Sequence, residues 1–438
     1  MSVRSTYYLV GSLNWFAIVL PMAVMVLLAQ TRGFSLSQIG LYMGLYSLTI
    51  IALELPSGAL ADTVGRKRIL LVAFALAAVA RLVFLFTFDI VTLLSFAVLS
   101  GASRALSSGA LEAWFIDALQ ADDADVDIQP ALATGNSFHL LGLASGTLVG
   151  GVLPMLFSAL PTSAEAVLTP LSSTVLASVV VQLIALAVCA TTMKEPRPER
   201  SITPSGDYGL TRSGASDRGL RNVREVLADA LELTKRNRTL QLLLGAELVV
   251  GLVLMTSELL WQPFYATNIG VGSDHTLVLG VVLAGCFGMG MVGNLAATPL
   301  SRLLGKRYAV VAGLFQLLQA ASFGLLALQT NLLLATACYW STYVMRSAWS
   351  SPHATLFNRE VPANRRSMML SVQSLVSFAG SFLGSVTLGP LAEATSIPVA
   401  WFTCGGLIAS TAVSYLVLAR LDDRVAGSGE PRVAGTVK

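Results

Sequence analysis

The stretch GALADTVGRKR, residues 58–68, places four charged side chains between two long apolar runs. The charges are Asp62, Arg66, Lys67 and Arg68, and the flanking runs are LYMGLYSLTIIALELPS and ILLVAFALAAVARLVFLFTF. A helix that crosses a bilayer needs about 20 predominantly apolar residues. The pattern therefore predicts a short charged loop that joins two membrane-spanning helices.

The rest of the chain repeats this alternation. Of its 438 residues 54% are hydrophobic and only 12% are charged, whereas soluble domains carry about 25% charged residues. The sequence therefore predicts an all-α membrane protein with twelve spans. The predicted spans are residues 7–29, 37–58, 69–88, 90–118, 131–156, 167–191, 241–267, 276–299, 309–328, 332–357, 367–388 and 396–419.

Lysine and arginine predict the orientation, because they accumulate in cytoplasmic loops. Of the 28 such residues, Arg81, Arg104 and Arg346 lie within spans. With both termini in the cytoplasm, Arg32 alone falls outside and the remaining 24 fall inside. We therefore expect cytoplasmic termini in a multi-pass protein of the plasma (inner) membrane. The net charge of +3 follows from this topology and gives no support to a nucleic-acid partner.

A polar segment between spans six and seven divides the chain into halves. Its first part is rich in Pro, Ser, Gly and Arg, and residues 220–236 have the apolar spacing of an amphipathic surface helix. We expect a six-helix bundle at 1–192, a cytoplasmic linker at 193–240, a second six-helix bundle at 241–420 and a cytoplasmic tail at 421–438.

The two halves show signs of duplication. LADTVGRKR at 60–68 aligns with LSRLLGKRY at 300–308, which superposes a glycine and a basic pair. Arg104 in span four likewise aligns with Arg346 in span ten. Related bundles with a central site are the architecture of many secondary transporters.

With this layout, GALADTVGRKR resembles the signature loop of the major facilitator superfamily, G-x-L-A-D-[RK]-x-G-[RK]-[RK]. The resemblance implies two six-helix bundles, transport by alternating access, and a kinship with bacterial drug/proton antiporters. Thr63 departs from the pattern, where the family commonly has a base. The matching residues are Gly58, Leu60, Ala61, Asp62, Gly65, Arg66 and Lys67.

The same loop is a candidate gate. Asp62 ends span two, and Arg66 follows closely enough to pair with it at the membrane edge. Gly58 permits close helix contact and Gly65 permits a sharp turn. The resemblance implies that the loop holds the cytoplasmic side shut in one state, with Asp117 as a further member. The alternative is that the three consecutive bases only fix the topology.

Ionisable groups within spans are functional candidates because each is costly to bury in lipid. Arg104 would attract an anion and would lower the proton affinity of a nearby carboxylate. Glu112 is our first candidate for proton coupling and Glu258 the second, followed by Glu54 and Glu247. The alternative for each is a structural ion pair or a polar helix contact. Arg81 we expect to pack, or to reach the outer interface.

Span five carries GLASGTLVGG, residues 142–151. It is similar to the family's antiporter motif, G-x-x-x-G-P-x-x-G-G, which implies export, although Thr147 replaces the proline. Glycines at this spacing also serve generic close packing between helices. The glycines that fit the motif are Gly142, Gly146, Gly150 and Gly151.

Several aromatic and polar residues within spans are candidates for lining a substrate cavity, because such a lining suits amphiphilic compounds. Trp and Tyr also anchor helices at membrane interfaces, which is the alternative for each. The candidates are Asn14, Trp15, Trp114, Trp261, Gln262, Tyr265, Tyr343, Trp349 and, as the counterpart of Arg104, Arg346.

These features favour a monomeric secondary active transporter that exchanges protons for a small hydrophobic or amphiphilic molecule. The closest rival is a proton-coupled importer of a nutrient or metabolite, and a more remote one is a transporter-like sensor. The chain lacks a phosphate-binding loop, and its three histidines are far apart in sequence. Its four cysteines lack metal-ligand spacing. We therefore expect no enzymatic function, no metal site and no cofactor.

Overall fold

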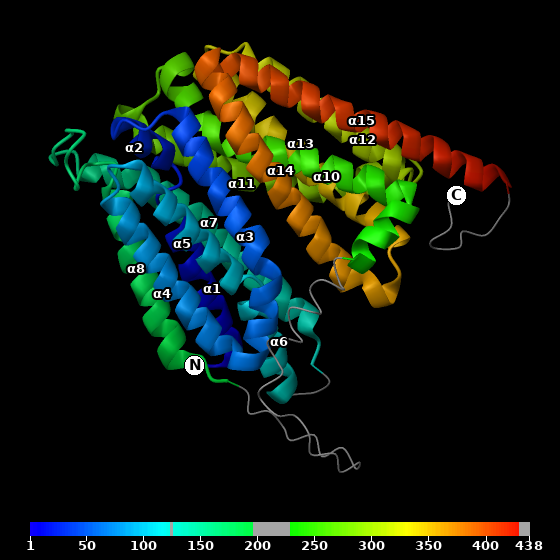
Figure 1. The fold of residues 1–438 in the computed structure, drawn as a ribbon, viewed down its shortest axis with the longest axis horizontal. Coiled ribbons are helices and arrows are strands. Elements are labelled where there is room, and N and C mark those ends of the chain that lie inside the picture. The colour runs from blue at the N-terminus through cyan, green and yellow to red at the C-terminus, as the bar shows by residue number, and fades with distance from the viewer. Residues whose placement is uncertain (123–125, 196–227, 429–438) are drawn as a thin grey trace.

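The computed structural model describes residues 1–122, 126–195 and 228–428 (Figure 1). All regular secondary structure within these ranges is helical, which confirms the predicted all-α class. The helices before the linker are α1 (Val3–Val19), α2 (Met25–Thr31), α3 (Leu36–Val64), α4 (Arg66–Leu85), α5 (Ile90–Ser107), α6 (Ala110–Asp122), α7 (Ile128–Leu156) and α8 (Ser173–Thr192).

After the linker the chain is equally helical. Residues 220–227 of the predicted surface helix lie outside the described residues, and residues 228–236 are helical. The later helices are α10 (Arg238–Phe264), a π-helical turn (Tyr265–Ile269), α11 (Thr276–Leu303), α12 (Tyr308–Ala327), α13 (Leu332–Glu360), α14 (Arg366–Ala394) and α15 (Ile397–Ser428), with single 3₁₀ turns at Ser273–His275 and Ala363–Arg365.

Ten helical segments of the described chain are long and apolar enough to cross a membrane. They correspond to ten of the twelve predicted spans. The other two predicted spans fall on α1, which has only 17 residues, and on α13, whose sequence is rich in Ser and Thr and includes Arg346 and His353. Apolar side chains on the outer surface are widely exposed, for example Val91 at 68%, Leu295 at 69% and Leu333 at 78%, as expected for a surface that faces lipid.

The span predicted at 7–29 is not one continuous helix, because the chain turns at residues 20–24 between α1 and α2. Pro21 lies in this turn and has no backbone N–H to continue the helix. The single span predicted at 90–118 is interrupted as well. Gly109 adopts φ +70° between α5 and α6, a left-handed conformation that favours glycine.

Glycine brings helices close together within the second half. An added Cβ at Gly251 of α10 would meet the backbone oxygen of Ser377 on α14 and would lie 3.0 Å from its Cα atom. Gly380 and Gly384 of α14 have the same relation to the backbone of α10 around Leu248 and Leu252. Small residues at such contacts allow backbones to approach closely in membrane proteins.

Two helix pairs join the first half of the chain to the second. Along α3 and α14, Gly40 contacts the Ser385 backbone and Gly389 would place a Cβ 3.0 Å from the Leu36 oxygen. Along α7 and α11, the Thr276 hydroxyl donates a 2.8 Å hydrogen bond to the Gly151 carbonyl. In Figure 1 the two groups of helices meet near α2 and diverge toward the end where α6 lies.

We expect Gly251→Ala to destabilise the protein by about 1–3 kcal/mol, because the new methyl group requires the α14 backbone to move. The measurement is thermal unfolding in detergent, followed by tryptophan fluorescence. The matched control is Gly245→Ala on the same helix, where an added Cβ has no neighbour within 4 Å. Equal unfolding temperatures for the two variants would contradict this packing.

Candidate functional site

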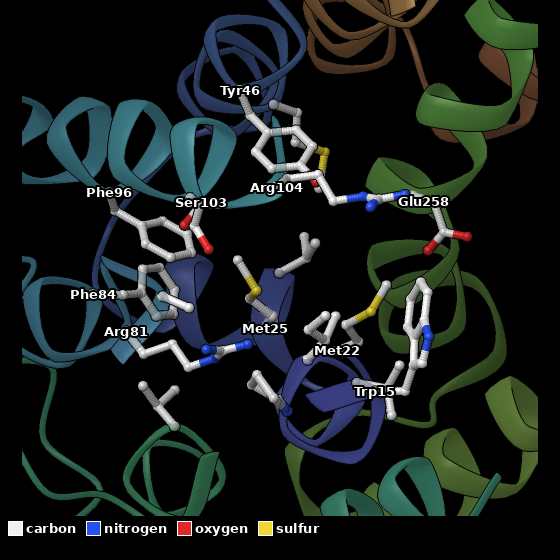
Figure 2. Close-up of a pocket in the computed structure, with 18 of the residues that line it drawn as sticks. Trp15, Met22, Met25, Tyr46, Arg81, Phe84, Phe96, Ser103, Arg104 and Glu258 are labelled. Carbon is white, nitrogen blue, oxygen red and sulfur yellow. The ribbon is translucent and has the colours of Figure 1, made fainter. Parts of the chain in front are cut away.

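A cavity of about 380 Å³ lies between the first group of helices and α10 and α11 (Figure 2). Most of its wall comes from α1 to α5, and the opposite wall comes from the second half of the chain. The lining of the second half consists of Met255, Glu258, Gln262 and Phe287. The site therefore depends on residues about 240 positions apart in sequence, which meet only when the two halves pack.

Two arginines extend into this cavity from neighbouring helices. Arg104 leaves α5 near its end, and its guanidinium carbon lies 5.9 Å from the centre of the Trp15 ring, within reach of a cation–π contact. Arg81 comes from α4 and donates a 3.0 Å hydrogen bond to Oε1 of Gln182. Gln182 in turn lies 3.5 Å from the amide oxygen of Asn14.

Glu258 on α10 occupies the opposite wall of the cavity. Its Oε1 accepts a 2.6 Å hydrogen bond from the hydroxyl of Tyr343 on α13, which fixes the carboxylate in place. Figure 2 shows Arg104 extended toward Glu258 across the cavity, although the pair is not within ion-pair distance. Of the described residues along the lining, Glu258 is the one carboxylate.

The remaining lining is mainly apolar and partly flexible. The chain supplies thioethers and aromatic rings around the charged groups, and methionine adapts to ligands of irregular shape. A few polar groups in an apolar cavity of this size are typical of a small-molecule site. The larger apolar side chains are Trp15, Met22, Met25, Met43, Phe84, Phe96, Met255 and Phe287.

Gln262 closes one end of the cavity and joins the two halves. Its Oε1 accepts hydrogen bonds from the backbone N–H groups of Val26 (3.0 Å) and Leu27 (3.3 Å), and its Nε2 donates to the Met22 carbonyl (2.8 Å). These groups flank the turn between α1 and α2, where the first helix is interrupted. A side chain of the second half thus satisfies backbone groups that the break leaves without helical partners.

The cavity residues predicted from the sequence fall into two groups. Asn14, Trp15 and Gln262 line the cavity together. Tyr343 and Arg346 line a small separate cavity within the second half, where Tyr343 reaches the site only through Glu258. The other aromatic candidates are buried in packing and hydrogen-bond contacts elsewhere: Trp114, Trp261, Tyr265 and Trp349.

Arg81 packs within the protein, which is one of the two predicted alternatives, and it does so at the cavity, where it lines the wall and donates to Gln182. Its partner Gln182 on α8 is fully buried, and a buried amide requires hydrogen-bond partners. The pattern that could have found this arrangement is the set of three polar residues, Asn14, Arg81 and Gln182, each alone within an apolar span.

The four carboxylates proposed for proton coupling occupy different places. Glu258 lines the cavity, whereas Glu54 on α3 accepts hydrogen bonds of 3.0 and 3.3 Å from Ser374 on α14. Glu247 accepts a 3.1 Å hydrogen bond from Gln373. Glu112 is exposed on α6, beyond the break at Gly109, so it does not continue the helical face of Arg104.

A buried polar chain in the second half was not predicted from the sequence. Nε2 of His353 lies 3.4 Å from the Glu247 carboxylate, and its Nδ1 lies 2.8 Å from the hydroxyl of Tyr415. The indole of Trp349 donates to the same hydroxyl at 2.7 Å. Trp349 and His353 are one helical turn apart on α13, but their partners come from α10 and α15, so spacing alone could not have identified the chain.

The loop predicted at 58–68 is mostly helical, because α3 continues to Val64 and α4 begins at Arg66, so Gly65 alone separates the two helices. This charged segment connects several helix ends. Gly65 has φ +104°, and an added Cβ would lie 2.5 Å from a carboxylate oxygen of Glu195, so glycine is required there. Lys67 donates to the carbonyls of Ala190 (2.8 Å) and Met193 (2.6 Å) at the end of α8. The loop thus holds the start of α4 against the end of α8.

Within the candidate gate, Arg66 forms an ion pair with Asp117 of α6. The Asp62 side chain and the surroundings of Gly58 lie outside the described part of the structure. The aligned loop of the second half has a comparable backbone, since Gly305 adopts φ +65° at the position that matches Gly65. The two loops therefore share a turn as well as a sequence pattern.

The glycine motif of α7 lies against α1 and α11. Added Cβ atoms at Gly142, Gly146 and Gly150 would meet backbone oxygens of α1, and one at Gly151 would lie 2.9 Å from the Cα atom of Gly280. The motif therefore packs α7 against its own half on one side and against the second half on the other.

The sequence profile of the Major Facilitator Superfamily matches residues 7–385. The chain belongs to this family. A comparison with curated protein sequences gives no match.

Solved structures with the same fold are transporters. The nucleoside transporter NupG is 11% identical with a TM-score of 0.76, over 95% of this chain and 99% of that chain. A bacterial homologue of the human lysosomal transporter Spinster, in an inward-facing and unoccupied conformation, is 16% identical with a TM-score of 0.69, over 99% and 98%. A peptide transporter of the POT type in complex with sulfate is 13% identical with a TM-score of 0.72, over 97% and 95%. At these identities the likeness establishes the fold.

We expect Asp117→Asn to lower the stability by less than about 1 kcal/mol, because the Asp117 side chain is 50% exposed and solvent screens its ion pair with Arg66. The loss should shrink as ionic strength rises. Thermal unfolding at low and high salt measures both effects. Asp122→Asn, on the same helix, is the control, and an equal response of the two variants would argue against the pair.

We expect Gln262→Leu to loosen the contact between α10 and the α1–α2 turn by about 1–3 kcal/mol, since it leaves three backbone groups without their side-chain partner. Spin labels at positions 165 and 274, in a background without native cysteines, would then show a longer mean distance and a broader distance distribution by double electron–electron resonance. Gln241→Leu on the same helix is the control, because the Gln241 side chain donates to the carbonyls of Thr234 and Lys235, which belong to the same half of the chain. An unchanged distance distribution in Gln262→Leu would contradict the role of this amide.

Proposed function

We propose that this chain is a secondary active transporter that exports small amphiphilic molecules across the plasma (inner) membrane in exchange for protons. Membership of the family and the transporter folds that it resembles support transport. The observation that carries the proposal is the cavity between the two halves, where Glu258 faces Arg104 across an apolar space.

The arrangement of the helices suits alternating access. We treat residues 1–192 and 241–420 as the two bundles that move and 193–240 as their cytoplasmic connection. The contacts of Gln262, and of Thr276 with Gly151, join the bundles at the α2 end, while Figure 1 shows the ribbons diverging toward α6. With cytoplasmic termini, this state faces inward. Export requires that these contacts break while the loop at 58–68 and its counterpart close the other side.

Among the candidate carboxylates, Glu258 has the geometry that coupling requires. A coupling group must contact the space that changes access, so that its affinity for protons differs between the two states. Glu258 lines the cavity, has a hydrogen-bond donor in Tyr343 and faces Arg104. Glu112 is exposed on α6 and does not line the described wall of the cavity. We therefore propose Glu258 as the group that binds the transported proton.

The second candidate function is import driven by the proton gradient, and it rests on the two arginines. If the substrate carries a negative charge, protonation of Glu258 removes a like charge from the cavity and favours substrate binding. A proton and substrate that bind together move in the same direction. If the substrate competes with the proton for Glu258, they move in opposite directions. Import and export thus differ in whether protonation of Glu258 strengthens or weakens substrate binding.

The first experiment identifies a substrate and the direction of its movement. Cells with and without the protein are compared for susceptibility to, and accumulation of, amphiphilic compounds, each with and without a protonophore. The strongest responder is then assayed in proteoliposomes under an imposed pH gradient. Substrate movement opposite to the downhill direction of protons supports export by exchange, and substrate movement in the same direction as protons supports import. No substrate flux for any responder would favour a sensor.

In the proteoliposome assay, we expect Glu258→Gln to abolish the dependence of flux on the pH gradient, because the amide cannot exchange a proton. Counterflow between equal substrate pools should persist, since it requires no net proton movement. Glu232→Gln, an exposed carboxylate of the 228–236 helix, is the control. Gradient-driven flux that survives in Glu258→Gln but is lost in Glu112→Gln would transfer the role to Glu112.

A further inference from the structure

The charges of the cavity lining do not balance. Among the described lining residues, Arg81 and Arg104 bring two positive charges, and Glu258 brings one negative charge. Even with Glu258 ionised, the lining keeps a net positive charge. In a site bounded by apolar side chains and lipid, charges are poorly screened, so an uncompensated cation strongly attracts an anion.

Neither arginine pairs with a carboxylate of the described residues. In the described part of the structure, no ion pair includes Arg81 or Arg104. Arg81 donates to a neutral amide, and Arg104 lies over the Trp15 ring. A guanidinium group has five N–H donors in a planar arrangement that matches carboxylate, sulfonate and phosphate oxygens. Both arginines therefore retain donors for a ligand.

The arginines also define where the parts of a ligand would lie. They project from the neighbouring helices α4 and α5, and Met22 and Met25 line the same cavity (Figure 2). The aromatic side chains Phe84 and Phe96 continue this wall. An acidic head group at the arginines would leave the apolar body of the molecule among methionine and aromatic side chains.

We propose that the substrate of this cavity is an amphiphilic organic anion, whose acidic head group is attracted by the positive charge of Arg81 and Arg104 and whose apolar body packs against the methionine and aromatic wall. This inference rests on the proposed transport function but concerns the charge of the ligand.

The test compares three probes with one apolar body and different charge: 2-naphthoate, 2-naphthamide and 2-naphthylmethylammonium. Binding to the full-length protein in lipid nanodiscs is measured by calorimetry, with empty nanodiscs to subtract partition into lipid. We expect 2-naphthoate to bind at least about tenfold more tightly than the amide, because charge-assisted hydrogen bonds exceed neutral ones by this margin. The ammonium compound should bind most weakly.

Variants of the arginines locate the effect. We expect Arg81→Gln and Arg104→Gln each to weaken 2-naphthoate binding about tenfold and to leave 2-naphthamide binding nearly unchanged. Arg81→Lys and Arg104→Lys retain the charge and should retain most of the preference for the anion, which separates loss of charge from loss of fold. Arg236→Gln removes an exposed charge outside the cavity and is the control.

The outcomes are separable from those of the transport assays. Equal or tighter binding of the amide or the ammonium compound, or no binding of any probe, would overturn the anion inference. An anion preference that the glutamine variants do not reduce would overturn it as well. Selective binding of 2-naphthoate without flux of any substrate would refute transport and leave the anion site intact. Flux of a cation would support transport and refute the anion site.

Discussion

The structure depends on one constraint: within hydrocarbon, every backbone N–H and C=O group that leaves a helix must find a partner inside the protein. The break between α1 and α2 creates such groups beside Pro21, and the side chain of Gln262 satisfies three of them. Because Gln262 belongs to the second half of the chain, the hydrogen bonds that satisfy these backbone groups also join the two halves. That contact closes one end of the central cavity and positions α10, which carries Glu258.

The cavity likewise contains few charged groups. Its wall is largely apolar, so a few ionisable groups determine the electrostatics of the whole space. Arg81 and Arg104 come from the first half and Glu258 from the second, so any relative motion of the halves changes their separation. In the proposed mechanism, substrate and proton therefore influence each other without direct contact, through the electrostatic energy of these charges.

Sequence reasoning predicted much of the fold, because long apolar runs and the signature loop depend only on neighbouring residues. It did not predict the helix breaks beside Pro21 and at Gly109, and at the first of these the freed backbone groups are satisfied by a distant residue, Gln262. It identified Asn14, Trp15, Arg104, Glu258 and Gln262 as candidates, and the structure brings these five to one cavity. It did not predict the partner of Arg81 or the His353 chain, since these partners come from helices that spacing along one helix cannot relate.

Adjacent positions on α14 bind carboxylates of opposite halves: Gln373 donates to Glu247 within the second half, and Ser374 donates to Glu54 of α3. Successive residues of an α-helix differ by about 100° in direction, so this helix is held from two sides at one level. An axial twist of α14 would strain both hydrogen bonds together. Two hydrogen bonds at adjacent positions of α14 thus connect the buried His353 of the second half, which faces Glu247, to α3 of the first half.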